Sequence, residues 1–149
     1  MTVIASPPAH SPPKARPSIG ARRFGYLVAA LIDATMLYLI NARPGWDAVP
    51  FLTSGTTEVL PWVNASIVAG VVVNLVYLVR DPRWLRALGD MVTAAFSFAA
   101  MVRIWEVFPL DLSDGWELVA RILLGLGLVG TLIGFVVALV SFVRNVGHD

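Results

Sequence analysis

The stretch Leu118–Val143, LVARILLGLGLVGTLIGFVVALVSFV, decides the fold class of this chain because it is almost entirely apolar. Arg121 is its single charged residue, and at about 1.5 Å per residue a helix of this length exceeds the roughly 30 Å hydrocarbon core of a bilayer. Three more apolar stretches of spanning or nearly spanning length precede it: Phe24–Ala42, Val59–Val79 and Ala87–Phe108. The sequence therefore predicts an all-α membrane protein built as a bundle of four transmembrane helices.

The composition supports this class and excludes several kinds of chemistry. The chain is 57% hydrophobic and 14% charged, with a mean hydropathy of +0.75, which leaves too little charge for the surface of a soluble domain. It has no cysteine, and its two histidines, His10 and His148, lie in the tails, so thiolate metal sites and intramembrane haem ligation are excluded. We find no catalytic constellation and expect no enzyme activity, no metal and no cofactor.

The first residues differ from the rest of the chain. Residues 1–21 are polar and rich in proline, and they contain no apolar set to bury, so we expect a disordered cytoplasmic tail. Residues 22–149 then form one four-helix transmembrane domain. The apolar run after Arg23 is too long for the core of a signal peptide, so it is interpreted as a retained first span.

The charges between the spans predict the orientation. One set of loops and tails is basic and the other is acidic, with Arg43 the exception. The basic set is Lys14, Arg16, Arg22, Arg23, Arg80, Arg83, Arg86 and Arg144; the acidic set is Asp47, Glu58, Glu106, Asp111, Asp114 and Glu117. Because basic loops stay on the cytoplasmic side, we expect both termini in the cytoplasm. Ten Arg against one Lys is typical of a GC-rich bacterial genome, so the expected location is the bacterial cytoplasmic membrane.

Asp33 is the most informative polar residue within the spans. It lies about 13 Å along the helix from Phe24, close to the membrane midplane, where a charge costs at least about 2.5–3.5 kcal/mol. Ser97 in the third span lies at a comparable depth and is the expected hydrogen-bonding neighbour, with Thr35 and Thr93 as further candidates. The pair is interpreted either as a proton- or cation-binding site or as a structural contact that fastens two helices together.

A second polar group lies towards the acidic side of the third and fourth spans. Arg103 has Glu106 three residues later, and Arg121 has Glu117 four residues earlier, so each arginine has an acid on its own helix. With Asp111 and Asp114 these residues form a predicted outer polar cluster. It is interpreted as an ion-paired clasp, with a site for an anionic headgroup or ligand as the alternative.

Small residues recur at the spacing that brings helices close together. Gly125, Gly127 and Gly130 match the dinucleotide-binding pattern, but inside an apolar span their backbone donors are already used by the helix. Gly127, Gly130 and Gly134 in the fourth span, and Ala95 and Ala99 in the third, are therefore predicted to pack against helices of the bundle or of a partner.

Two functions remain open after this reasoning. The first is an accessory or structural subunit, or an assembly partner, of a larger membrane complex; its partners are the bilayer and other membrane-protein subunits or further copies of itself, and not nucleic acid. The second is a small proton- or cation-coupled transporter that uses Asp33. Four spans with one acid midway along the first are similar in outline to small multidrug-resistance exporters. The long loop Arg43–Glu58 and the charged third and fourth spans depart from that pattern. A lipid-modifying enzyme is a third reading, but it lacks a nucleophile or base.

Overall fold

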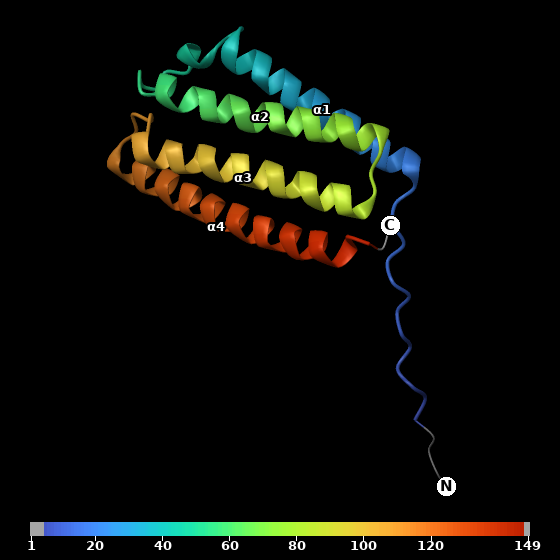
Figure 1. Cartoon of the computed structure of the whole chain (residues 1–149). Helices are drawn as coiled ribbons and strands as arrows, with labels where there is room; N and C mark the ends of the chain where they lie inside the picture. Colours follow the sequence, from blue (N-terminus) through green and yellow to red (C-terminus); the bar gives the residue numbers. More distant parts are fainter. Residues whose placement is uncertain (1–4, 148–149) are drawn as a thin grey trace.

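A computed structural model describes residues 5–147, and within them four long helices account for the four predicted spans (Figure 1). They are α1 (Ile19–Asn41), α2 (Thr56–Val79), α3 (Arg83–Val107) and α4 (Asp114–Asn145), with a short helix η1 (Trp46–Ala48) after α1. Each of the four is long and apolar enough to cross a membrane. This confirms the prediction of an all-helical chain and indicates a multi-pass membrane protein.

The ends of the helices follow local chemistry. Ser18 caps α1 by accepting a hydrogen bond from the Ala21 backbone N–H at 3.2 Å, so this helix begins five residues before the predicted apolar stretch. Pro82 immediately precedes α3, in the extended conformation that favours a helix start. Phe108 ends α3 in the left-handed region at φ 45°. The apolar stretch thus locates each helix, while the caps set its bounds.

The helices pack in chain order, α1 on α2, α2 on α3 and α3 on α4 (Figure 1). Within residues 5–147, α1 and α4 form no extended contact with each other. The expected bundle is therefore an open layer with α1 and α4 at its two edges. Many large apolar side chains are exposed on it; Leu123, for example, is 63% exposed. Exposed apolar surface of this kind suits contact with lipid.

Small side chains fill most of the buried positions between the helices. Ala30, Ala87, Gly89, Ala100 and Ala138 are all buried. Small residues let helix backbones approach closely, and this close approach gains van der Waals contact where lipid gives no hydrophobic drive.

The tightest of these contacts joins α2 to α3. Tyr77 of α2 is buried over Gly89, and its hydroxyl donates to the Arg86 carbonyl at 2.6 Å and to the Asp90 carboxylate at 3.1 Å. The ring of Tyr26 lies 5.3 Å from that of Tyr77, so α1 also reaches this contact. A side chain at position 89 would overlap the tyrosine, which makes glycine a steric requirement there.

Connecting loops tie the two helical hairpins together at the opposite end. The Thr53 backbone N–H donates to the Pro109 carbonyl at 2.9 Å, and the Asp111 N–H donates to the Phe51 carbonyl at 2.8 Å. These bonds flank an isolated antiparallel bridge between Leu52 and Leu110. We call this the acidic end, formed by residues 42–58 and 106–117. The basic end is formed by residues 14–23, 80–86 and 144–147.

Candidate functional sites

Asp33 lies near the middle of α1 and faces Gly70 of α2. A Cβ placed on Gly70 would lie 2.5 Å from Oδ2 of Asp33, so the absence of a side chain makes room for the carboxyl group. Asp33 is only partly buried, and no hydrogen bond to its carboxyl group is found among residues 5–147. The side-chain amide of Asn74 donates to the Gly70 carbonyl at 2.9 Å, which adds a second polar group one turn along α2.

The structure does not bring Asp33 together with Ser97. Ser97 belongs to α3, whereas α1 packs on α2. The hydroxyls of Thr35 and Thr93 are used within their own helices, donating to the Leu31 carbonyl at 2.7 Å and the Gly89 carbonyl at 3.1 Å. Asp33 therefore stands as a single carboxyl group beside a glycine. This arrangement can accept a hydrogen bond from a further helix, or take up a proton or a cation.

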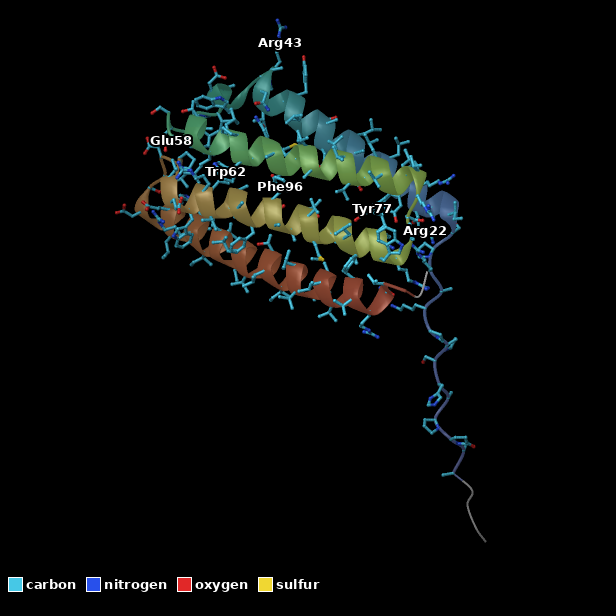
Figure 2. The ribbon with its side chains drawn as sticks, viewed as in Figure 1. Arg22, Arg43, Glu58, Trp62, Tyr77 and Phe96 are labelled. Atoms are coloured by element: carbon cyan, nitrogen blue, oxygen red, sulfur yellow. The ribbon has the colours of Figure 1, made fainter. Side chains whose placement is uncertain are left out.

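The outer polar cluster divides into two ion-paired groups. Arg103 pairs with Glu106 at 3.2 Å and with Glu58 of α2 at 3.6 Å, while Arg121 pairs with Glu117 at 3.2 Å. These side chains are about 37–60% exposed, and such pairs contribute little stability. Glu58 lies at the acidic end in Figure 2. The sequence places Glu58 in the acidic set, but the predicted outer polar cluster did not include it.

Aromatic rings complete the group around Arg121. Its guanidinium lies 4.1 Å from the centre of the Phe108 ring and 5.4 Å from that of Trp105, which are cation–π distances. Asp111 joins this region through its backbone bond to Phe51, and Asp114 is the first residue of α4. Since both arginines already have carboxylate partners, the geometry favours the clasp over an anion site.

The glycines of α4 have different surroundings. A Cβ on Gly127 would lie 2.9 Å from the Met101 sulfur, so this glycine packs on α3. At Gly125, Gly130 and Gly134 a Cβ would meet no atom of the described residues within 4 Å. On α3, Ala95 is exposed and Ala99 is partly buried. The chain therefore covers Gly127 but leaves Gly130 and Gly134 open.

Two further polar contacts were missed from the sequence. The side-chain amides of Asn41 and Asn64 exchange a pair of hydrogen bonds, both 2.8 Å long, between α1 and α2. A charged residue inside a long apolar run stands out in the sequence. An asparagine near the end of a span does not, so the sequence does not predict this contact.

The second missed contact surrounds Asp81 at the basic end. Its carboxylate pairs with Arg22 at 2.9 Å and Arg16 at 3.3 Å and accepts a hydrogen bond from the Tyr26 hydroxyl at 2.9 Å (Figure 2 labels Arg22). Partial burial acts to raise the pKa of Asp81, but the tyrosine hydroxyl and the two guanidinium groups outweigh it and hold that pKa below its usual range. Asp81 thereby ties the segment before α1 to the α2–α3 turn.

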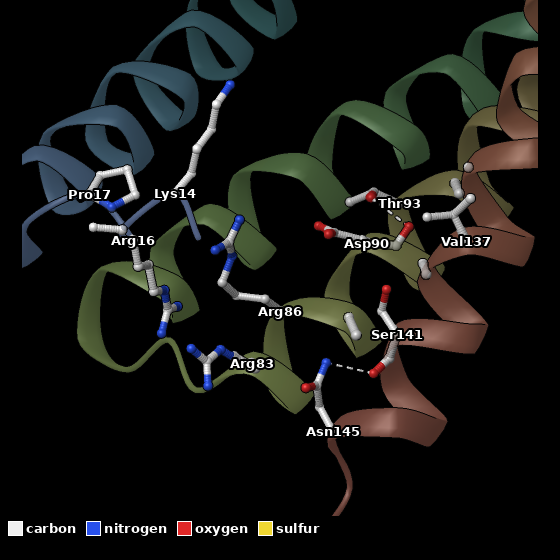
Figure 3. Close-up of a pocket in the computed structure, with 15 residues that line it drawn as sticks. Lys14, Arg16, Pro17, Arg83, Arg86, Asp90, Thr93, Val137, Ser141 and Asn145 are labelled. Atoms are coloured by element: carbon white, nitrogen blue, oxygen red, sulfur yellow. Dashed lines mark hydrogen bonds between the residues drawn. The ribbon is translucent and has the colours of Figure 1, made fainter. Parts of the chain in front are cut away.

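Above this contact, the structure has an open groove of about 920 Å³ between residues 14–17, α3 and α4 (Figure 3). Basic side chains line one part of it and small apolar side chains line another. Within the described part of the chain, no group of three His, Asp or Glu side chains is placed to hold a metal ion.

Comparisons with protein-family models, with curated proteins and with solved structures found no significant match.

Proposed function

We propose that this protein is an accessory or assembly subunit of a larger complex in the bacterial cytoplasmic membrane, with both termini in the cytoplasm. The open layer of helices carries the proposal. Among residues 5–147, it leaves Asp33 without a hydrogen-bond donor and leaves Gly130 and Gly134 uncovered on α4. Both features call for a neighbour that this chain does not supply itself.

Asp33 lies midway along α1, where a carboxyl group is costly in a membrane. An ionisable group at the centre of a bilayer costs at least about 2.5–3.5 kcal/mol, and such groups face protein or water rather than lipid. A partner helix with a hydroxyl or amide side chain opposite Asp33 would lower this cost by donating a hydrogen bond. The hydrogen bond to Asp33 would then fix the position of the partner helix along α1.

The second of these features lies on α4. Glycines one turn apart allow another backbone to approach closely, and Gly130 and Gly134 have this spacing. They are exposed, and no atom of residues 5–147 lies within 4 Å of a Cβ built on either. We place a partner helix, from another membrane protein or a further copy of this chain, on this part of α4.

A test of the α4 interface uses matched leucine substitutions. We expect Gly130→Leu with Gly134→Leu to reduce recovery of partners with the tagged chain in mild detergent by about fivefold or more, since leucines hold the helices apart. The melting temperature of the purified chain should change little, because nothing lies within 4 Å of either position. Gly125→Leu, at another open position, is the control. Unchanged recovery in the double variant would place this surface against lipid and contradict the proposal.

The orientation can be tested by labelling single introduced cysteines, because the chain has no native cysteine that would react. Ser11 and Ser54 are both exposed, one before α1 and the other in the loop of the acidic end. In intact cells, an impermeant thiol reagent should label a cysteine at position 54 and not one at position 11. Equal labelling of both would contradict the four-span arrangement, and reversed labelling would contradict cytoplasmic termini.

Transport remains the second candidate, and the isolation of the Asp33 carboxyl group supports it. A carboxylate that binds a proton or a cation in turn must be free of a permanent partner, and none is found for Asp33 among residues 5–147. Substitutions at Asp33 separate this candidate from the subunit role, as argued in the Discussion.

A further inference from the structure

The groove at the basic end brings four basic side chains together in one lining. Its basic lining consists of Lys14, Arg16, Arg83 and Arg86. The ion pairs within residues 5–147 involve Arg16 but none of the other three. An excess of positive charge therefore lines one cavity, and the chain does not neutralise it.

Arg86 is the central side chain of this group. Figure 3 shows it, with Arg83, between the segment before α1 and the wall formed by α4. Its Nε is buried and has no hydrogen-bond partner in the described part of the chain. The terminal nitrogens of Arg86 are not among the buried atoms, and they donate in no hydrogen bond within residues 5–147. These two groups can therefore donate to an occupant of the groove that accepts hydrogen bonds.

The acids nearby do not satisfy this charge. Asp90 is the single carboxylate in the lining, against four basic side chains, and it forms no ion pair within residues 5–147. Asp81 lies outside the lining and is held by Arg16, Arg22 and Tyr26. Arg83 is also the first residue of α3, where the helix dipole adds partial positive charge.

The rest of the groove is apolar and made of small side chains. Ala87 and Ala94 of α3 face Gly134, Val137 and Ala138 of α4 across it. Ser141 and Asn145 lie nearer the end of α4, with the Asn145 amide donating to the Ser141 carbonyl at 2.7 Å. One cavity thus combines a cationic part with an apolar wall that runs along two membrane-spanning helices.

From this combination we propose that the groove binds an anionic phospholipid. The phosphate group accepts hydrogen bonds from Arg83 and Arg86, and Lys14 adds charge. One acyl chain lies along the small residues between α3 and α4. Arginine suits this role because its planar group donates several hydrogen bonds to phosphate oxygens. Basic pockets between transmembrane helices on the cytoplasmic side bind lipid headgroups in this way.

The apolar wall favours a lipid over a free anion. A soluble phosphate would use only the cationic part and would leave the surface of Ala94 and Val137 without an occupant. A lipid fills both parts, and the lateral position of the groove, between two spans, gives an acyl chain access from the bilayer. Gly134 lines this groove and also belongs to the α4 surface proposed for a partner helix. The acyl chain is therefore placed against Ala94, Val137 and Ala138. The lipid proposal rests on this wall and the arginines of the groove, and not on the subunit role.

The test measures lipid association with the full chain in nanodiscs. The probe is spin-labelled phosphatidylglycerol at a few per cent in phosphatidylcholine, and the fraction of immobilised label is recorded. We expect Arg83→Gln with Arg86→Gln to weaken association about thirtyfold at low salt. The control is Arg23→Gln with Arg80→Gln, which removes the same charge from the same end outside the groove, and should weaken association less than threefold. The Arg86 carbonyl, which accepts from Tyr77, is kept in the variant.

Further measurements separate a lipid site from a free-anion site and from an effect of general surface charge. Ala94→Leu, which fills the apolar wall and keeps every charge, should also weaken the association, and circular dichroism should show that this variant and the arginine variants remain helical. If the two arginine pairs lost lipid association equally, general surface charge would account for the effect, and this would overturn the proposal. So would displacement of the label by millimolar inorganic phosphate, which would indicate a free-anion site. Equal immobilisation of labelled phosphatidylcholine would also overturn it.

Discussion

Replacing Gly89 by alanine is expected to lower the free energy of unfolding by about 1–3 kcal/mol, the cost of overpacking a tight contact. The added Cβ would overlap the Tyr77 hydroxyl and would lie 2.8 Å from Cγ1 of Val73. To relieve this overlap, α2 and α3 must separate or Tyr77 must leave its two hydrogen-bond acceptors. The loss should be measurable as a lower melting temperature of the purified chain in detergent.

The control is the same substitution where the chain leaves space. Gly25 and Gly125 have nothing within 4 Å of a Cβ, so Gly25→Ala and Gly125→Ala should be neutral or up to about 1 kcal/mol stabilising, as helix propensity predicts. Tyr77→Phe removes the colliding oxygen, so we expect Gly89→Ala combined with Tyr77→Phe to lose less than the sum of the two single variants. If Gly89→Ala matched the controls, the close approach of α2 and α3 at this point would be wrong.

The sequence was sufficient for the helices because their physical cause is local. Long apolar runs must become helices in lipid, and all four runs did so within a few residues of the predicted bounds. The larger differences at the ends come from caps such as Ser18, which extends α1 beyond the apolar run to Ile19.

The sequence was not sufficient for the partners of each polar group. Depth along a helix follows from the residue number, and on that basis the sequence predicts comparable depths for Asp33 and Ser97. The direction in which a side chain points depends on how the helices pack, and the open layer turns Asp33 towards Gly70. Glycine itself carries no polar signal. Similarly, the contacts of Asp81 with Arg16 and Arg22 depend on the path of the chain before α1, which the sequence does not predict.

Substitutions at Asp33 should have the largest effect on function and should separate the two candidate roles. Asp33→Asn keeps the size beside Gly70 and can still form hydrogen bonds. A structural contact with a partner helix should therefore survive, with normal abundance, normal partner recovery and full complementation of a deletion strain. Asp33→Leu has similar bulk but no polar atom. We expect it to reduce partner recovery by about 3- to 30-fold, the equivalent of an interhelical hydrogen bond of about 0.6–2 kcal/mol.

Two matched variants make the comparison specific to the observed geometry. Gly70→Ala places a Cβ 2.5 Å from Oδ2 and should displace the carboxyl group, so we expect it to resemble Asp33→Leu in partner recovery. Ser97→Ala, on α3, should behave as the unmodified chain. A transporter predicts a different pattern, because a coupling carboxylate must gain and lose a proton or a cation. In that case Asp33→Asn would fold and accumulate normally but fail to complement. This outcome would overturn the subunit role, whereas a fully functional Asn variant beside a failed Leu variant would exclude transport through Asp33.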